Sequence, residues 1–311
     1  MSTTDIAVSR SKTTASFRTK QRDRQLLALI GYVTLAVLAI LCLLPFILII
    51  SSSLTKESTI VLEGFKFFPT DFSTEAYHIL FKYPEQMIQA YIVTIAVTAL
   101  GTASGLFLTS MTAYCLSRKD FKWRNQFSFF FFFTTLFSGG LVPWYLLIVN
   151  YLHLKDTLLV LILPMVFNVF YIIVMKSFMS GIPEAITESA KIDGAGDFLI
   201  FIRLIIPLSK PALATIGLFL ALGYWNDWYN ALLFISDEKL MPLQYYLYKM
   251  LGNMDGMRKA MMGSGAVVTK ALPTEGLKMA MTIVASGPIL IAYPFIQKYF
   301  VTGLTIGAVK G

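Results

Sequence analysis

The chain has 311 residues, of which 56% are hydrophobic and only 14% are charged. Because soluble domains are about a quarter charged, this composition excludes an ordinary soluble globular protein and indicates an integral membrane protein. The formal net charge is +8, but the cations cluster beside apolar segments, which reports membrane orientation and not nucleic-acid binding.

The N-terminal region combines a basic tail with a long apolar run. Residues 1–25 are rich in Ser and Thr and hold six Lys or Arg, which predicts a disordered basic tail. The apolar run 26–50 has 25 residues, too many for the core of a signal peptide and enough to cross a bilayer. We therefore interpret this run as the first transmembrane helix.

Apolar runs later in the chain predict further transmembrane helices. Each approaches the roughly 20 residues that cross about 30 Å of hydrocarbon, and the prolines in them are tolerated where neighbouring helices satisfy the freed backbone groups. The sequence thus predicts an all-α membrane protein with six transmembrane helices in one domain, 26–300. The five additional spans are 87–116, 127–149, 158–175, 207–235 and 279–297.

The distribution of Lys and Arg sets the expected orientation. The loop 117–126 holds four of these residues and the loop 150–157 only one, so the first of the two, like the basic tail, is expected in the cytoplasm. Six spans then place the loop 176–206 inside, the loop 236–278 outside, and the C-terminal tail 301–311 inside. Both termini are therefore predicted to be cytoplasmic.

The loop 176–206 has a pattern of its own. The segment Glu188-Ser189-Ala190 is followed by three residues, Gly194, nine residues and Leu204-Ile205-Ile206-Pro207. Proline is favoured at the start of a helix, and carboxylates in the first turns complement the helix dipole; Pro183 and Glu184 fit both rules. Gly194 breaks the helix, so the pattern predicts a helix–Gly–helix on the cytoplasmic face. From the residues alone, an ordinary interfacial connector remains an alternative.

This spacing resembles the cytoplasmic signature of the permeases of binding-protein-dependent ABC importers. The chain departs from that signature in three places: Ser189 replaces an alanine, Leu204 an isoleucine and Ile206 a leucine. The resemblance implies the type I ABC importer permease fold in a bacterial cytoplasmic membrane. It also implies that the loop is a coupling helix, seated in a groove of a cytoplasmic ATPase. The residues expected to couple are Glu184, Glu188, Ser189, Ala190, Asp193, Gly194, Ala195 and Pro207.

Further segments resemble the carbohydrate-uptake branch of these permeases. They are Pro207-Leu208-Ser209-Lys210-Pro211, the aromatic segment 224–230, Pro242-Leu243-Gln244 and the tail 303–311. The tail implies ATPase contacts by Gly307, Val309 and Lys310, as in maltose-type permeases. The segment 272–279 is similar to a subgroup that imports larger or charged oligosaccharides. The implied partners are a second homologous permease, two ATPase subunits, an extracellular solute-binding protein, a carbohydrate substrate and membrane lipid.

The aromatic segment is the candidate substrate pathway. An ionisable residue inside a membrane usually faces a cavity or a partner, and aromatic rings beside amides and carboxylates suit sugars. Tyr224 and Asp227 are three residues apart and would share one helix face. We expect this face to line a water-filled pathway, with Asn226 and Trp228 nearby. The alternative is an aromatic belt at the outer interface, or a contact with the partner permease.

No catalytic constellation is apparent in the sequence. The phosphate-binding pattern Gly-x-x-x-x-Gly-Lys-[Ser/Thr] is absent, so the chain is expected to be no enzyme and to bind no cofactor or metal, with ATP and Mg²⁺ held by the partner ATPase. Two other functions stay open at this point: an ion-coupled secondary transporter, which would need a buried relay of ionisable groups, and a membrane receptor or scaffold.

Overall fold

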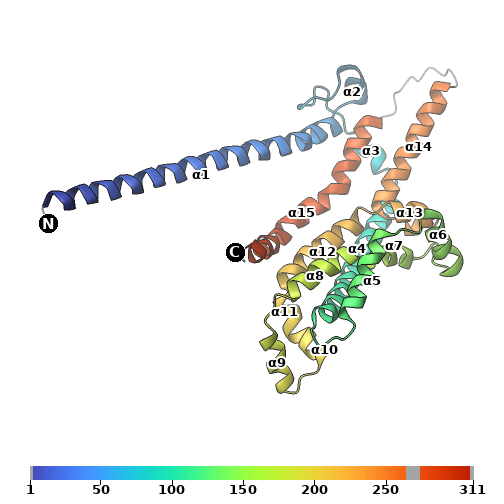
Figure 1. Cartoon of the computed structure of the whole chain (residues 1–311). Coiled ribbons are helices and arrows are strands. Elements are labelled where there is room, and N and C mark those ends of the chain that lie inside the picture. Colours follow the sequence, from blue (N-terminus) through green and yellow to red (C-terminus); the bar gives the residue numbers. More distant parts are fainter. Residues whose placement is uncertain (1–2, 264–273, 309–311) are drawn as a thin grey trace.

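The computed structural model describes residues 3–263 and 274–308, and within those ranges the regular structure is helical. Figure 1 shows a helical bundle from which α1 projects as a single long rod. The principal helices are α1 (Thr3–Ser53), α2 (Glu57–Glu63), α3 (Glu75–Leu80), α4 (Pro84–Ser117), α5 (Arg124–Leu136), α6 (Leu141–Leu146), α7 (Leu158–Val166), α8 (Val169–Met179), α9 (Glu184–Ile192), α10 (Asp197–Ile200), α11 (Ile206–Leu208), α12 (Lys210–Trp225), α13 (Tyr229–Phe234), α14 (Leu243–Gly263) and α15 (Thr274–Ala308).

The centre of the bundle is α4, which packs against α12, α8 and α7. Small residues on α4 allow this close approach. A methyl group on Gly101 would fall within 2.7 Å of three atoms of the Tyr224 ring, and one on Gly105 would lie 3.2 Å from Leu220. Tyr224 and Leu220 of α12 are both buried here, so the α4–α12 contact forms the middle of the apolar core.

The N-terminal helix differs from the expectation for residues 1–25. The predicted apolar span lies within Arg24–Ser53, which is long and apolar enough to cross a membrane. The helix nevertheless continues back to Thr3, where a disordered tail was predicted. Once an apolar helix is formed, each added residue gains one backbone hydrogen bond without a new nucleation step, which a reading of composition alone does not capture.

The remaining spans are less regular than the sequence suggested. In the described residues, α1 and α4 pass as straight membrane-crossing helices, and up to five spans result if each of three bent pairs counts as one. The pairs are Arg124–Leu136 with Leu141–Tyr151, bent by 115°, Leu158–Val166 with Val169–Met179, bent by 50°, and Asp197–Leu208 with Lys210–Trp225, bent by 83°. The sixth predicted span, 279–297, lies inside α15 but is not among these segments.

The predicted outer loop 236–278 is also more ordered than a loop. It contains the 21-residue helix α14 and the first turns of α15. Charged residues such as Lys249 and Asp255 made this helix too polar for a span, so the apolar count assigned it to a connection. A helix that packs beside α15 outside the bundle needs only a partial apolar face.

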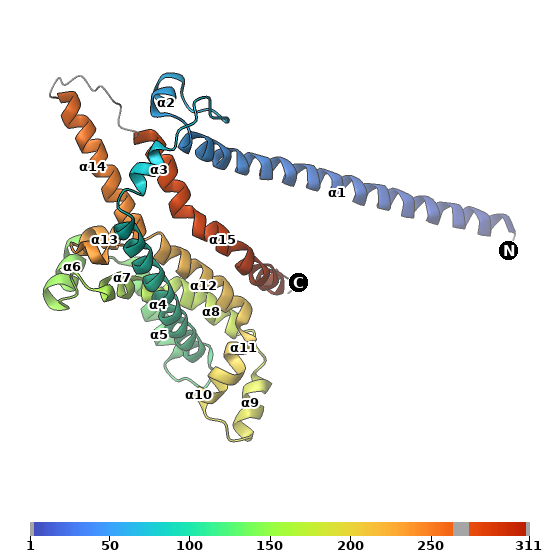
Figure 2. The ribbon, with the colours of Figure 1, turned by 180° about the vertical axis from the view of Figure 1, so that it is seen from behind.

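The two ends of the bundle carry different elements. Figures 1 and 2 place α9 and α10 at one end, and α2, α3 and the upper part of α14 at the opposite end. The predicted loops 176–206 and 236–278 thus lie at opposite ends, and the side of the membrane that each faces stays a prediction.

Candidate functional site

The signature loop forms the helix–Gly–helix that its sequence predicts. Pro183 precedes α9 with extended backbone (ψ 132°), and Glu184 opens the helix. Helix α9 ends at Ile192, and Gly194 adopts a left-handed backbone with φ +80°, a conformation that glycine reaches at no steric cost. The Ala195 amide donates to the Ala190 carbonyl at 2.9 Å, which turns the chain back towards α10.

The outer surface of this loop is exposed and partly apolar. Ile192 is 86% exposed and Phe198 64% exposed. Contiguous patches of such side chains are typical of protein-contact sites, and these two are the candidates on this loop. The other predicted coupling residues are placed on or beside it: Glu184, Glu188, Ser189, Asp193 and Pro207 are exposed, and Ala190 and Ala195 are half-buried.

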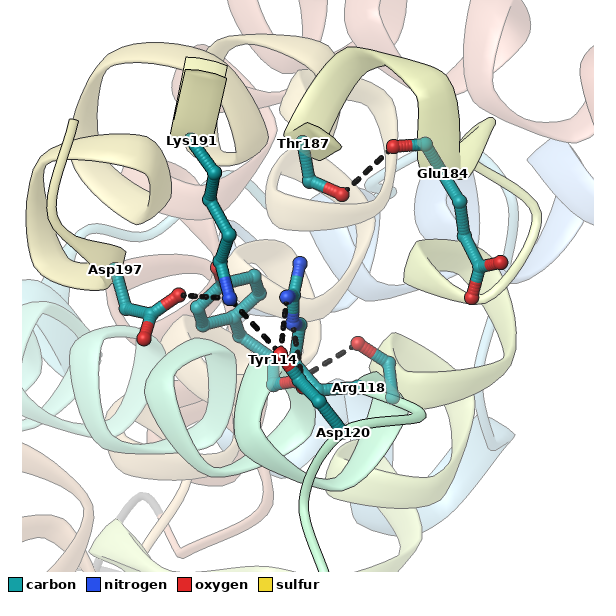
Figure 3. Close-up of polar contacts among 8 residues, drawn as sticks. Tyr114, Arg118, Asp120, Glu184, Thr187, Lys191 and Asp197 are labelled. Atoms are coloured by element: carbon teal, nitrogen blue, oxygen red, sulfur yellow. Dashed lines mark hydrogen bonds and ion pairs between the residues drawn. The ribbon is translucent and has the colours of Figure 1, made fainter. Parts of the chain in front are cut away.

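An ion-pair network joins this loop to the end of α4 (Figure 3). Arg118 forms two hydrogen bonds with Asp120, at 3.1 Å from Nε and 2.6 Å from a terminal nitrogen. Lys191 of α9 reaches the same Asp120 carboxylate at 2.9 Å and also Asp197 of α10 at 3.3 Å. A second pair joins Lys119 and Glu184 at 2.9 Å.

These contacts border a cavity and perturb its charged groups. A cavity of about 690 Å³ lies between the loop 117–124 and α9. Hydrogen bonds from Arg118 and Lys191 hold the pKa of Asp120 well below its usual range. The sequence reasoning used the cations of the loop 117–126 only for orientation, and so it missed their pairing with α9; ion-pair partners 65 or 71 residues apart leave no local signal.

The predicted substrate residues do not form one wet face, which corrects that expectation. Tyr224 is only 2% exposed, and its hydroxyl donates to the Ile162 carbonyl at 2.9 Å. Asp227 instead accepts hydrogen bonds from the Asn230 backbone amide at 3.2 Å and side-chain amide at 2.9 Å. Helix α12 ends at Trp225, so the helical spacing assumed for 224–228 is broken at the turn.

The turn does bring Trp228 into a groove with residues of α14 and α15, and it leaves Asn226 exposed beside Gln244 of that groove. Trp228 stacks on Tyr248 with 4.8 Å between ring centroids and 24° between planes. Gln244 and Asn226 contact each other through their side-chain amides at 3.5 Å. The groove has a volume of about 290 Å³ and also exposes Lys278. Its residues come from the turn before α13, from α14 and from α15, so no contiguous motif could reveal it.

A buried carboxylate anchors α15 beside this groove. Glu57 is 6% exposed and accepts hydrogen bonds from the backbone amides of Glu275 and Gly276, both at 3.0 Å, and from the Thr274 hydroxyl at 3.3 Å. A carboxylate at a helix N-terminus satisfies amides that lack partners within the helix. The sequence analysis missed Glu57, and it treated Thr274-Glu275-Gly276 only as a family resemblance.

The third predicted group is the C-terminal tail. Gly307 lies in the last turn of α15, whereas Val309 and Lys310 fall outside the described residues. The ATPase contact of this tail therefore stays a prediction.

The bundle has segments long and apolar enough to cross a membrane, an exposed charged loop at one end and an aromatic groove at the other, which defines a multi-pass membrane protein. Residues 101–306 match the family described as "Binding-protein-dependent transport system inner membrane component", and the chain belongs to this family. It is thus a multi-pass permease subunit of a bacterial ABC importer, as the signature predicted.

Named relatives and a solved structure agree with this assignment. The chain is 42% identical over 282 residues to the polygalacturonan/rhamnogalacturonan transport system permease protein YtcP of Bacillus subtilis, covering 90% of this chain and 96% of that protein. It is 28% identical to the arabinooligosaccharides permease protein AraQ of the same organism, covering 88% and 92%. A bacterial ABC transporter that imports the acidic polysaccharide alginate matches with a TM-score of 0.75 and 30% identity, over 90% of this chain and 98% of that one. Neither a secondary transporter nor a receptor finds support in these similarities.

Proposed function

We propose that this permease imports acidic oligosaccharides, of the kind released from uronic acid polysaccharides. Two similar proteins carry such substrates in their names, one a polygalacturonan and rhamnogalacturonan permease and one an alginate importer. The observation in this chain that carries the proposal is the groove between Trp228, which precedes α13, and the helices α14 and α15.

The chemistry of the groove suits a charged sugar. The stacked pair Trp228 and Tyr248 offers an aromatic surface for the C–H faces of a pyranose ring, and both rings are substantially exposed. Gln244 lines the groove and supplies an amide group for hydroxyls, and the exposed Asn226 that it contacts supplies a second one beside the groove. Lys278 supplies a cation for a carboxylate; its ammonium group is 3.0 Å from Glu275, so a sugar carboxylate would compete with that partner.

The working complex is proposed to follow the arrangement that the family implies. This chain would pair with a second permease, bind two ATPase subunits through the loop 176–206 and the tail, and receive substrate from an extracellular binding protein. ATP and Mg²⁺ would be bound by the ATPases, and closure of these subunits would move the coupling helix and switch the pathway between its two openings.

Six spans with both ends in the cytoplasm remain the proposed topology. Single cysteines at positions 122 and 255, placed in a background without Cys42 and Cys115, test it. A membrane-impermeant maleimide should label position 122 only from the cytoplasmic side and position 255 only from outside. The reverse pattern would exclude this topology.

The substrate proposal is tested by uptake into vesicles that contain the whole complex with its binding protein. A trimer of galacturonic acid should be imported and neutral maltotriose should not. Trp228→Ala should lower uptake of the acidic trimer about 10-fold, since stacking on one aromatic ring contributes roughly 0.5–1.5 kcal/mol beyond the buried area. Lys278→Gln should lower it less. Tyr151→Ala, an exposed aromatic residue outside the groove, is the matched control and should behave as wild type.

The possible results separate the two parts of the proposal. Import of maltotriose in preference to the acidic trimer would refute the substrate class. Unchanged uptake in both groove variants, with the acidic trimer still imported, would retain the substrate and remove the groove from its pathway.

A further inference from the structure

We infer that Asp120 is a positioning residue that couples α9 to α4, so that movement of the signature loop is transmitted to the central helix of the bundle. The group formed by Arg118, Asp120, Lys191 and Asp197 is called the latch. It deepens the proposed coupling role of the loop 176–206, on which it rests.

Three separate segments meet at the latch. Asp120 belongs to the short loop after α4, Lys191 to α9 and Asp197 to α10 (Figure 3). Lys191 lies before Gly194 and binds Asp197 beyond it at 3.3 Å, as well as Asp120 of the loop after α4 at 2.9 Å. One ammonium group therefore holds both arms of the helix–Gly–helix and joins them to the loop after α4.

The other side of the latch continues into the apolar core. The Arg118 side chain, only 17% exposed, holds Asp120 with two hydrogen bonds and lies 5.9 Å from the centroid of the Tyr114 ring. Tyr114 is buried in α4 and packs against Phe201, with ring centroids 5.4 Å apart. Phe201 follows α10 directly, so the contacts form a closed path from α9 through Asp120 to α4 and back to the signature loop.

The geometry favours a mechanical role over a contribution to stability. Isolated exposed ion pairs contribute little to stability, and Lys191 and Asp120 are both partly exposed. A bidentate Arg–carboxylate contact, however, fixes direction as well as distance. When a partner protein pulls on α9, either the end of α4 moves with it or the contact between Lys191 and Asp120 breaks.

The second pair at the same place gives a comparison. Lys119 and Glu184 also join the loop to α9, but their side chains are 72% and 50% exposed. Among the described contacts, no hydrogen bond or ring contact links the side chains of this pair to buried residues of the core. It should therefore matter less for coupling than the latch, although it joins the same two segments.

The test uses the complete transporter in vesicles, with ATP hydrolysis measured in the presence and absence of its own extracellular binding protein. Asp120→Asn should reduce the stimulation by the binding protein at least about 5-fold, the lower end of typical allosteric coupling, while unstimulated hydrolysis and the amount of assembled complex stay as in wild type. Lys191→Gln, which leaves Arg118 and Asp120 intact, should give the same result. Asp120→Glu should restore most of the stimulation, and Lys119→Gln should lose less than about 2-fold.

Several results would overturn the inference. Normal stimulation in Asp120→Asn and Lys191→Gln would show that the latch transmits nothing. A parallel fall in assembled complex and in both rates would show that Asp120 serves only stability. Glu188→Lys and Gly194→Pro test the underlying coupling assignment. If they also retain stimulation, the loop 176–206 is not the coupling element. If these two variants lose stimulation while Asp120→Asn and Lys191→Gln retain it, the loop is still the coupling element and only the role of the latch is refuted.

Discussion

The two ends of this molecule are built on different physical principles. At the end proposed to be cytoplasmic, ion pairs whose side chains are 39% to 72% exposed, apart from the 17% exposed Arg118, join the loop after α4 to α9 and α10. From the middle of the core to the opposite end, the contacts that fix α12 and α15 are buried or partly buried: the Tyr224 hydroxyl on the Ile162 carbonyl, the Trp225 indole on the Ala285 carbonyl, and Glu57 on the first amides of α15. Exposed ion pairs can be exchanged at low cost, whereas buried hydrogen bonds are costly to break.

This difference suits the roles proposed for the two ends. A loop proposed to exchange contacts with an ATPase needs interactions that form and break readily, and exposed ion pairs provide them. A groove proposed to bind substrate needs its rings and amides held in place, and the buried and partly buried contacts on its supporting helices provide that. The predictions below test whether the core and the outer end are as rigidly supported as these contacts imply.

The largest effect is expected where α4 and α12 approach most closely. Gly101→Ala would place a methyl group against the ring of Tyr224, whose hydroxyl is tied to Ile162. Overpacking of a filled core costs about 1–3 kcal/mol, and the tethered ring cannot move aside without losing its hydrogen bond as well. We therefore expect a loss of about 3 kcal/mol or more in the free energy of unfolding, read as a lower midpoint of thermal unfolding in nanodiscs.

Gly31→Ala is the matched control, because a methyl group there has no neighbour within 4 Å. In an exposed helix this change should stabilise slightly, by about 0.5–1 kcal/mol. Equal midpoints for the two variants would mean that α4 and α12 do not pack as tightly as described.

The sequence predicts the two ends to different extents. Spacing within one short segment was enough to predict α9, the turn at Gly194 and the second arm, because every residue involved is local. The same reasoning placed Asn226 and Trp228 near substrate but extended the helix through a turn at 226–228, and so paired Tyr224 with Asp227. Gln244, Tyr248 and Glu57 escaped prediction because their partners lie on other helices, far away in the chain.

Apolar counting showed a similar limit for the fold. It detected the runs that become α1 and α4, because each is one uninterrupted helix. It could not show that three other segments bend by 50° to 115°, since a bend depends on how neighbours satisfy the freed backbone groups. The polar helix α14 was missed for the opposite reason, because its composition resembles a loop.

A smaller effect is expected at the buried anchor of α15. Glu57→Gln keeps the shape of the side chain but replaces one acceptor oxygen with an amide donor, which would face a backbone amide of Glu275 or Gly276. Leaving a buried donor without an acceptor costs about 1–3 kcal/mol, so the thermal midpoint should fall. Hydrogen exchange should also speed up in the first turns of α15, because loss of the anchor would make these turns and the groove residue Lys278 more mobile.

Glu63→Gln, at the other end of α2, is the control. It removes only an exposed pair with Lys66 and should change stability by less than about 1 kcal/mol. If Glu57→Gln melts and exchanges like Glu63→Gln, the N-terminus of α15 is held by something other than this carboxylate, and the contrast between a rigid outer end and an adaptable cytoplasmic end would not hold there.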